Sequence, residues 1–172
     1  RDDKGESYFK NIFQMCSHLM LKINKNNKPV IAMIDGIATA AGCQLISSCD
    51  LAYSSSRAKY ATPGVNIGLF CSTPMVPLSR TVGKKQAMEM LLTGDLIDAN
   101  KALRIGLIND VFEEDSLKEN VFQIAKKISS KSSNTIKIGK EAFYKQKDMN
   151  LEDAYTYTSK VMTENMLNDD SK

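Results

Sequence analysis

The sequence contains only one histidine and four cysteines, which limits the kinds of site that it can build. Its cysteines show no C-x-x-C spacing and stand among apolar residues, which argues against a structural zinc site and a secreted disulfide framework. We expect all four to be reduced residues of the interior: Cys16, Cys43, Cys49 and Cys71. His18 has no evident nucleophile partner, so we interpret it as a solvated or packed side chain.

Long apolar runs and a strong charge of one sign are also missing. No run approaches the roughly 20 residues that cross a bilayer. The net charge of +3 is too small to indicate a nucleic-acid partner, although it would not repel an anionic small molecule. The first residues, Arg1 to Gly5, mix both charges and predict neither a signal nor a transit peptide. A length of 172 residues with 42% apolar and 25% charged residues fits one globular domain.

Two kinds of periodicity divide the chain. Residues 7–23 have apolar side chains at intervals of three and four, which predicts an amphipathic helix. Short runs rich in strand-forming residues predict strands at 30–34, 51–54, 59–61 and 107–112. Further helices are expected at 72–80 with Ser72 as N-cap, 84–92, 98–105 with Gly106 as its end, 113–131, 133–147 and 150–167.

These elements predict a strand-and-helix part, 1–106, followed by a helical C-terminal region, 107–172, that we expect to serve oligomerisation. Methionines in the periodic segments are interpreted as core filling: Met15, Met20, Met33, Met88 and Met90.

The turn between the first strand and the next segment is rich in small residues. Asp35-Gly36 ends the strand, and Ala40-Ala41-Gly42 leads into a short helix. A helix N-terminus of this kind can direct free backbone N–H groups at an anion or a carbonyl oxygen. Small residues also permit close packing of a helix against a strand, so the turn alone leaves both interpretations open.

The longer context resembles a known family. The run from Lys28 to Leu45 is similar to the crotonase (enoyl-CoA hydratase/isomerase) signature K-P-V-I-A-A-V-N-G-x-A-x-G-G-G-x-E-L, and the runs 49–53, 82–95 and 99–108 match later family motifs in order and spacing. The resemblance implies an α/β crotonase (ClpP-like) fold: a partial spiral of strand-strand-helix units, then an all-helical C-terminal region. Residues 61–74 resemble a mitochondrial subgroup of the family, which implies a mitochondrial location, with a cytoplasmic one as the alternative.

The resemblance also assigns a site. In the family, a backbone N–H in the small-residue turn binds a thioester carbonyl, and Ala41 occupies that place here. A second donor comes from an upstream S-A-G-x-D type segment that these 172 residues do not contain. The same alignment suggests further pocket residues: Ala40, Gly42, Pro63, Asn66, Gly68, Phe70 and Ser72. We expect no metal and no cofactor, since coenzyme A would enter as part of the substrate.

The catalytic positions depart from the family. Its hydratases use two glutamates as acid and base, and those positions here are Gln44 and Gly64. A neutral amide cannot take a proton near pH 7, and glycine has no side chain to do so. Losing one such group typically costs about 10²–10⁴ in rate. Asp35 after the strand and Asn66 after the altered loop are considered as substitutes, together with Cys71 to Thr73 near the expected acyl group.

Three functions follow as hypotheses. The first is a protein of fatty-acid metabolism that binds an acyl-CoA thioester with weak or absent hydratase activity. The second is an active hydratase or other crotonase-type enzyme that uses non-standard residues. The third is a non-catalytic structural or regulatory oligomer. By resemblance, a homotrimer or hexamer is expected, with no nucleic-acid partner and no membrane span.

Overall fold

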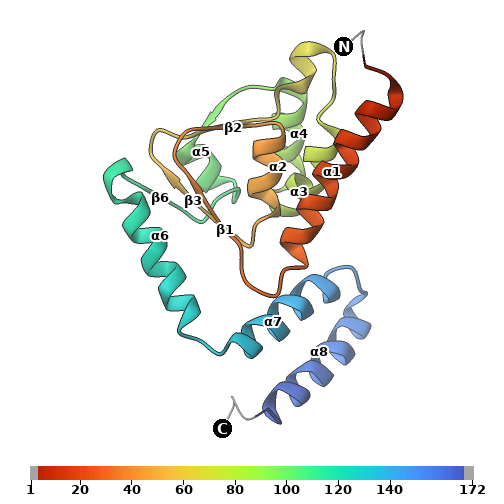
Figure 1. Ribbon diagram of the computed structural model, residues 1–172, viewed down its shortest axis with the longest axis vertical. Helices are drawn as coiled ribbons and strands as arrows, with labels where there is room; N and C mark the ends of the chain where they lie inside the picture. The colour runs from red at the N-terminus through yellow and green to blue at the C-terminus, as the bar shows by residue number, and fades with distance from the viewer. Residues whose placement is uncertain (1–3, 169–172) are drawn as a thin grey trace.

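The computed structural model describes residues 4–168. The prediction that the first residues form no targeting segment concerns Arg1 to Asp3, which lie outside the described residues. Figure 1 shows a mixed part at the N-terminal side and a helical extension at the C-terminal end. The helices are α1 (Glu6–Asn24), α2 (Ala41–Ser48), α3 (Ser72–Thr81), α4 (Lys84–Thr93), α5 (Ala99–Arg104), α6 (Glu114–Ser129), α7 (Ser133–Gln146) and α8 (Leu151–Met166). The strands are β1 (Ile31–Ile34), β2 (Ile37–Thr39), β3 (Leu51–Ser55), β4 (Lys59–Ala61), β5 (Ile97–Asp98) and β6 (Asp110–Phe112), and a 3-10 helix, η1, spans Pro63–Ile67.

The strands form two small sheets. Strands β1, β3 and β6 are parallel, in the order β1-β3-β6, with Ile31 opposite Leu51. In the second sheet, β2 is parallel to β4 and β4 is antiparallel to β5, with Thr39 opposite Ala61. Because β2 leads directly into α2, this register brings the start of α2 beside the end of β4 and the η1 loop.

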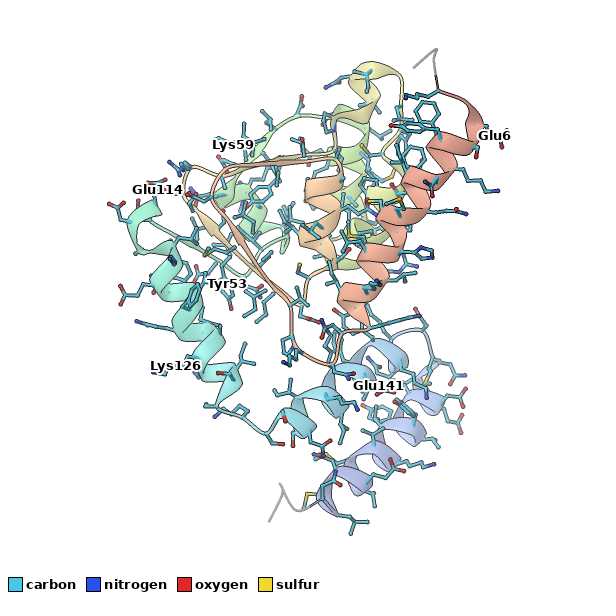
Figure 2. The ribbon with its side chains drawn as sticks, in the orientation of Figure 1. Glu6, Tyr53, Lys59, Glu114, Lys126 and Glu141 are labelled. Atoms are coloured by element: carbon cyan, nitrogen blue, oxygen red, sulfur yellow. The ribbon has the colours of Figure 1, made fainter. Side chains whose placement is uncertain are left out.

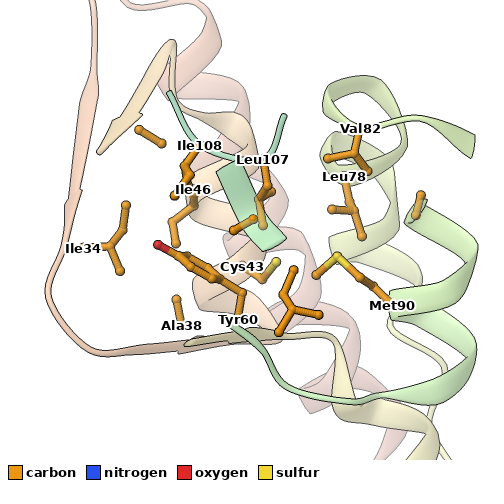
Figure 3. Close-up of a cluster of buried hydrophobic side chains, with 14 of the residues drawn as sticks. Ile34, Ala38, Cys43, Ile46, Tyr60, Leu78, Val82, Met90, Leu107 and Ile108 are labelled. Atoms are coloured by element: carbon orange, nitrogen blue, oxygen red, sulfur yellow. The ribbon is translucent and has the colours of Figure 1, made fainter. Parts of the chain in front are cut away.

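Helix α2 lies at the centre of the main core, between β2, α1 and α3. Its buried side chains include Cys43 and Ile46, which pack in one cluster with Tyr60, Leu78 and Met90 (Figure 3). The Tyr60 hydroxyl is fully buried and donates a hydrogen bond to Ser54 Oγ at 2.7 Å. This bond meets the need of the buried hydroxyl for a partner and joins β4 to β3.

The helical extension contacts the core through α6 and through α7, whose Lys140 bonds Asp50. Helix α6 packs on β1, β3 and β6, where Leu117 and Val121 cover Tyr53, labelled beside that helix in Figure 2. Helices α7 and α8 lie side by side beyond it (Figure 1). Leu107 and Ile108 belong to the main core, so the core continues past Gly106.

Several sequence predictions needed correction. Strands β2 and β5 and the helix η1 were not expected, since each has five residues or fewer and too short a pattern to detect. The N-cap of α3 is Cys71 and not Ser72, which is already helical. Met15, Met33 and Met88 are exposed and not core residues, because they lie on the outward sides of their elements, whereas Met20 and Met90 are buried.

Other predictions are confirmed. Gly106 follows α5 with φ +80, the left-handed conformation expected after a helix. His18 is solvent-exposed on α1. The four cysteines are free thiols; Cys43 and Cys71 are buried, and Cys16 and Cys49 are partly buried. Between residues 4 and 168, no helix has both the length and the apolarity to cross a bilayer.

Candidate active site

The turn before α2 has a strained backbone. Ala40 has φ 48 and ψ −111, a region that L residues with a side chain rarely occupy. Its N–H donates to Ala61 O at 3.0 Å, and its carbonyl accepts from Gln44 N at 3.0 Å, so both ends of the residue are held. The peptide that follows therefore has a fixed direction.

Ala41 is the first residue of α2, and it is exposed. Among residues 4–168, no acceptor bonds its N–H, as expected for the first turn of a helix. The positive end of the helix dipole lies at the same point, which favours an oxygen carrying negative charge. Gly42 follows, and a Cβ there would meet only Ala38 Cβ, at 3.7 Å. The geometry thus provides one free, fixed backbone donor.

Gln44 lies one turn further along α2 and is only 3% exposed. The Cys16 thiol of α1 donates to its Oε1 at 3.4 Å. The first family glutamate position is therefore occupied by a buried neutral amide in contact with a thiol. This side chain can hold a ligand by hydrogen bonds and cannot act as a base.

Gly64 is buried in η1, at the second family glutamate position. A Cβ at this position would overlap Leu69 O and would lie 2.8 Å from Cys71 Sγ. Two hydrogen bonds hold the segment in this shape: Leu69 N–H donates to Gly64 O at 2.9 Å, and Gly64 N–H donates to Cys71 Sγ at 3.3 Å. The loop thus fills with its own backbone the space that a side chain at this position would need.

A cavity of about 720 Å³ opens beside Gln44, between α1, α2, α3 and α7. Its walls combine apolar and polar side chains from helices far apart in the sequence. The lining residues that sequence reasoning missed include Met20 and Leu21 of α1, Val76 and Pro77 of α3, and Phe143 and Tyr144 of α7. For the residues of α3, the sequence indicated only a helix. A helical spacing does not identify which element a given face of the helix contacts.

Two polar residues that line this cavity, Asp50 and Tyr144, are already bonded within the protein. Asp50 accepts from Val30 N at 2.7 Å, from Lys140 Nζ at 2.7 Å and from the Tyr144 hydroxyl at 2.9 Å. These three bonds make Asp50 a structural carboxylate. Burial, followed by the hydrogen bond to Asp50, raises the pKa of Tyr144, so its phenol stays protonated near neutral pH.

Two thiols of α2 and its C-cap, Cys43 and Cys49, are also unsuited to proton transfer. Burial, with a smaller effect of Cys71, raises the pKa of Cys43 to about 12. Burial, followed by the charge of Asp50, raises the pKa of Cys49 to about 11. Both remain protonated thiols at neutral pH and are poor nucleophiles.

The predicted pocket residues fall into two groups. Ala40 and Gly42 flank Ala41 at the start of α2, whereas the other five lie on η1, the following loop and the start of α3: Pro63, Asn66, Gly68, Phe70 and Ser72. Asn66, Gly68, Phe70 and Ser72 are exposed, and of the predicted site residues only Gln44 lines the 720 Å³ cavity. The binding role of the seven predicted pocket residues stays a prediction.

Asp35, considered as a substitute acid or base, is exposed and bound to Arg57 by two hydrogen bonds of 2.6 and 2.9 Å. The guanidinium lowers the pKa of Asp35, which makes this carboxylate a weaker base.

Comparisons with known proteins identify the family of the chain. A profile of the enoyl-CoA hydratase/isomerase family matches residues 5–172. The mouse protein named enoyl-CoA hydratase domain-containing protein 3, mitochondrial, is 49% identical over 165 residues, covering 96% of this chain and 55% of the relative. Its human counterpart is 48% identical over 165 residues, covering 96% and 54%. The chain thus spans about half the length of these curated relatives.

Solved structures confirm the predicted crotonase fold. The crystal structure of human enoyl coenzyme A hydratase domain-containing protein 3 has a TM-score of 0.97 at 47% identity, covering 99% of this chain and 68% of that one. An enoyl-CoA hydratase of Mycobacterium smegmatis has a TM-score of 0.95 at 41% identity, covering 98% and 65%. By sequence and by structure, the chain belongs to the enoyl-CoA hydratase/isomerase family.

Proposed function

We propose that this protein binds an acyl-CoA thioester at the N-terminus of α2, with little or no hydratase turnover. The observation that supports it best is the free N–H of Ala41, held in place by the strained Ala40, three residues before Gln44, which lines the cavity. A fixed backbone donor at a helix N-terminus suits the partial negative charge of a thioester carbonyl oxygen. The acyl chain would extend from there into the cavity.

The low turnover follows from the two replaced positions. Hydration of an enoyl thioester needs a group that takes a proton from water and a group that delivers one to carbon. Gln44 provides neither, and Gly64 is enclosed by Leu69 O and Cys71 Sγ. Coenzyme A enters as part of the ligand, and the proposal requires no metal or other cofactor.

Calorimetry on the full-length protein tests binding. We expect butyryl-CoA to bind with a measurable Kd, and the absence of heat with any acyl-CoA at millimolar concentration would refute the proposal. Turnover of crotonyl-CoA tests the second part. We expect a rate at least about 10²-fold below that of an ordinary hydratase such as the Clostridium acetobutylicum short-chain-enoyl-CoA hydratase, a relative 35% identical to this chain. A comparable rate would establish an active enzyme with non-standard residues.

We also propose that the protein assembles as a homotrimer or hexamer, partly through α8. Four large apolar side chains of α8 are at least 60% exposed and lie on one stripe of the helix at spacings of four, seven and four: Leu151, Tyr155, Met162 and Met166. Such a stripe usually meets another apolar surface. Analytical ultracentrifugation of the full-length protein should give a multiple of three, and a monomer would contradict this.

A mitochondrial location is the further expectation, supported by the names of the mouse and human relatives. Subcellular fractionation of cells expressing the full-length protein tests it. A protein confined to the cytosolic fraction would instead support the cytoplasmic alternative.

A further inference from the structure

Three cations without an acidic partner line the cavity of about 720 Å³. They are Lys25, Arg80 and Lys147, and among residues 4–168 none of them forms an ion pair. Two acidic residues also line the cavity, but one of them, Asp50, already has its own cation. The cavity wall therefore carries an excess of positive charge.

The three cations lie at the same end of the cavity, beside the C-terminal end of α2. The side chain that precedes Lys25 donates to Ser48 O at 2.9 Å. The side chain that follows Arg80 donates to Ser47 O at 3.1 Å. Lys147 Nζ donates to Arg80 O at 3.0 Å, so the end of α7 lies at the same point. The ends of α1, α3 and α7 thus bring their positive charges together, and we call this place the charged end of the cavity.

The guanidinium of Arg80 is held on the cavity side of α3. Its Nη1 donates to Val76 O at 2.9 Å, and Val76 lines the same cavity one turn earlier on this helix. Val76 O is a neutral acceptor, so the bond fixes the direction of the guanidinium and leaves its charge uncompensated. The remaining N–H groups of Arg80 are the donors that suit a carboxylate.

The charged end lies at a defined distance from the proposed thioester donor. Ser47 follows Ala41 by six residues on α2, which is about 9 Å along the helix axis. An extended chain advances about 1.2 Å per bond, so a chain that starts at the Ala41 N–H reaches the charged end after about seven bonds. A methyl group gains nothing from cations at that point, whereas a carboxylate is complementary to them.

We propose that the charged end binds a carboxylate at the far end of the acyl chain, with Arg80 and Lys147 as its main partners. The ligand class is then a dicarboxylic acid of about eight carbons, joined to coenzyme A through one of its two carboxyl groups. This inference rests on the acyl-CoA binding proposed above and adds the length and the end group of the acyl chain.

Two pairs of ligands test the end group and the length. Suberyl-CoA and octanoyl-CoA both have eight carbons and differ only in the terminal carboxylate, and glutaryl-CoA and pentanoyl-CoA form the same pair with five carbons. Titration calorimetry of the full-length protein should give a Kd for suberyl-CoA about tenfold below that of octanoyl-CoA, the size of one charge-assisted hydrogen bond. Glutaryl-CoA should show no such preference, because its four bonds span only about 5 Å.

Variants assign the preference to the named cations. Arg80→Met should lower the ratio of the octanoyl-CoA and suberyl-CoA Kd values to about threefold or less and leave the octanoyl-CoA Kd within about twofold. Lys147→Met should lower the ratio in the same direction. The matched control is Lys84→Met, an exposed cation of α4 that does not line the cavity, and it should keep the full ratio.

Cations at the ends of helices also stabilise the helix dipole, and the same variants separate that role from ligand binding. If Arg80 and Lys147 served only the helices, their replacement would lower the unfolding temperature and leave the ratio of Kd values unchanged. Thermal unfolding of each variant gives this second measurement and shows that the variant is folded.

The outcomes keep the two proposals apart. If none of the four thioesters binds, the acyl-CoA function is wrong, and this inference with it. If suberyl-CoA and octanoyl-CoA bind with equal Kd, or if glutaryl-CoA gains as much over pentanoyl-CoA, acyl-CoA binding stands and the carboxylate site is overturned. A preference that persists in both Arg80→Met and Lys147→Met overturns it as well.

Discussion

The Lys140 ammonium lies 2.7 Å from Asp50 Oδ2, and this contact joins α7 to the start of β3. The Lys140 side chain is 7% exposed and also donates to the carbonyls of Ile23 and Lys28. One cation therefore satisfies three acceptors from the end of α1, the following loop and the residue before β3. It thereby links the helical extension to three segments of the core.

Removing this cation should destabilise the protein. Lys140→Met leaves the Asp50 carboxylate partly buried without its charge partner, and we expect a loss of about 3 kcal/mol in the free energy of unfolding. Lys137→Met, on the same helix but exposed, is the matched control and should change it by less than about 0.5 kcal/mol. Urea unfolding measures both, and equal effects would contradict the role of the buried pair.

The strained turn predicts that glycine substitutions at two neighbouring residues change the stability in opposite directions. Ala40→Gly removes the Cβ from a residue with φ 48, and we expect it to stabilise the protein by about 1 kcal/mol. Ala41→Gly, with no positive φ to relieve, should destabilise it by about 0.5 kcal/mol. Thermal unfolding compares them, and a destabilising Ala40→Gly would show that the turn carries no strain.

Gly64 should not accept a side chain. Gly64→Ala places a Cβ against Leu69 O and Cys71 Sγ, and we expect a loss of about 3 kcal/mol. The matched control is Gly139→Ala, where a Cβ inside α7 meets nothing within 4 Å, and it should gain up to about 1 kcal/mol. If Gly64→Ala were neutral by chemical unfolding, the loop would have to rearrange easily.

Alkaline pH should weaken the fold. Folding raises the pKa of the Cys43 thiol from 9.0 to about 12, so the folded state keeps a proton that the unfolded state loses. The stabilisation is complete below pH 9 and is lost as the pH rises from 9 toward 12, by about 1 kcal/mol per pH unit. Cys43→Ala should show a shallower decline between pH 8 and 10 in urea unfolding. Equal slopes for the two proteins would exclude this thiol as the cause.

Much of the fold could be predicted because its helices are long enough to display their period. Helices α1, α3 and α4 and the three C-terminal helices begin and end within a few residues of the predicted limits. Strands β2 and β5 could not be predicted in this way, because they exist through pairing with β4, a contact between distant parts of the chain. Local pattern carries no information on such pairing.

The candidate site was predictable only in part, and for a similar reason. Ala41 and Gln44 could be located from the family resemblance, because both lie in one continuous run that matches the signature. The contact of Cys16 with Gln44 joins residues 28 positions apart, and the cavity walls come from α1, α3 and α7. The positive φ of Ala40 could not be predicted, because alanine is not a residue type that favours this conformation.

The enclosed position of Gly64 also sets the evolutionary routes open to this protein. A single replacement of Gln44 by glutamate changes the charge of one side chain and leaves the backbone in place. A single replacement of Gly64 by glutamate would be opposed by selection for folding before any new chemistry appeared, because the carbonyl of Leu69 must move first. A carboxylate at this position therefore requires the loop from Gly64 to Cys71 to be rebuilt, and not one codon to be changed.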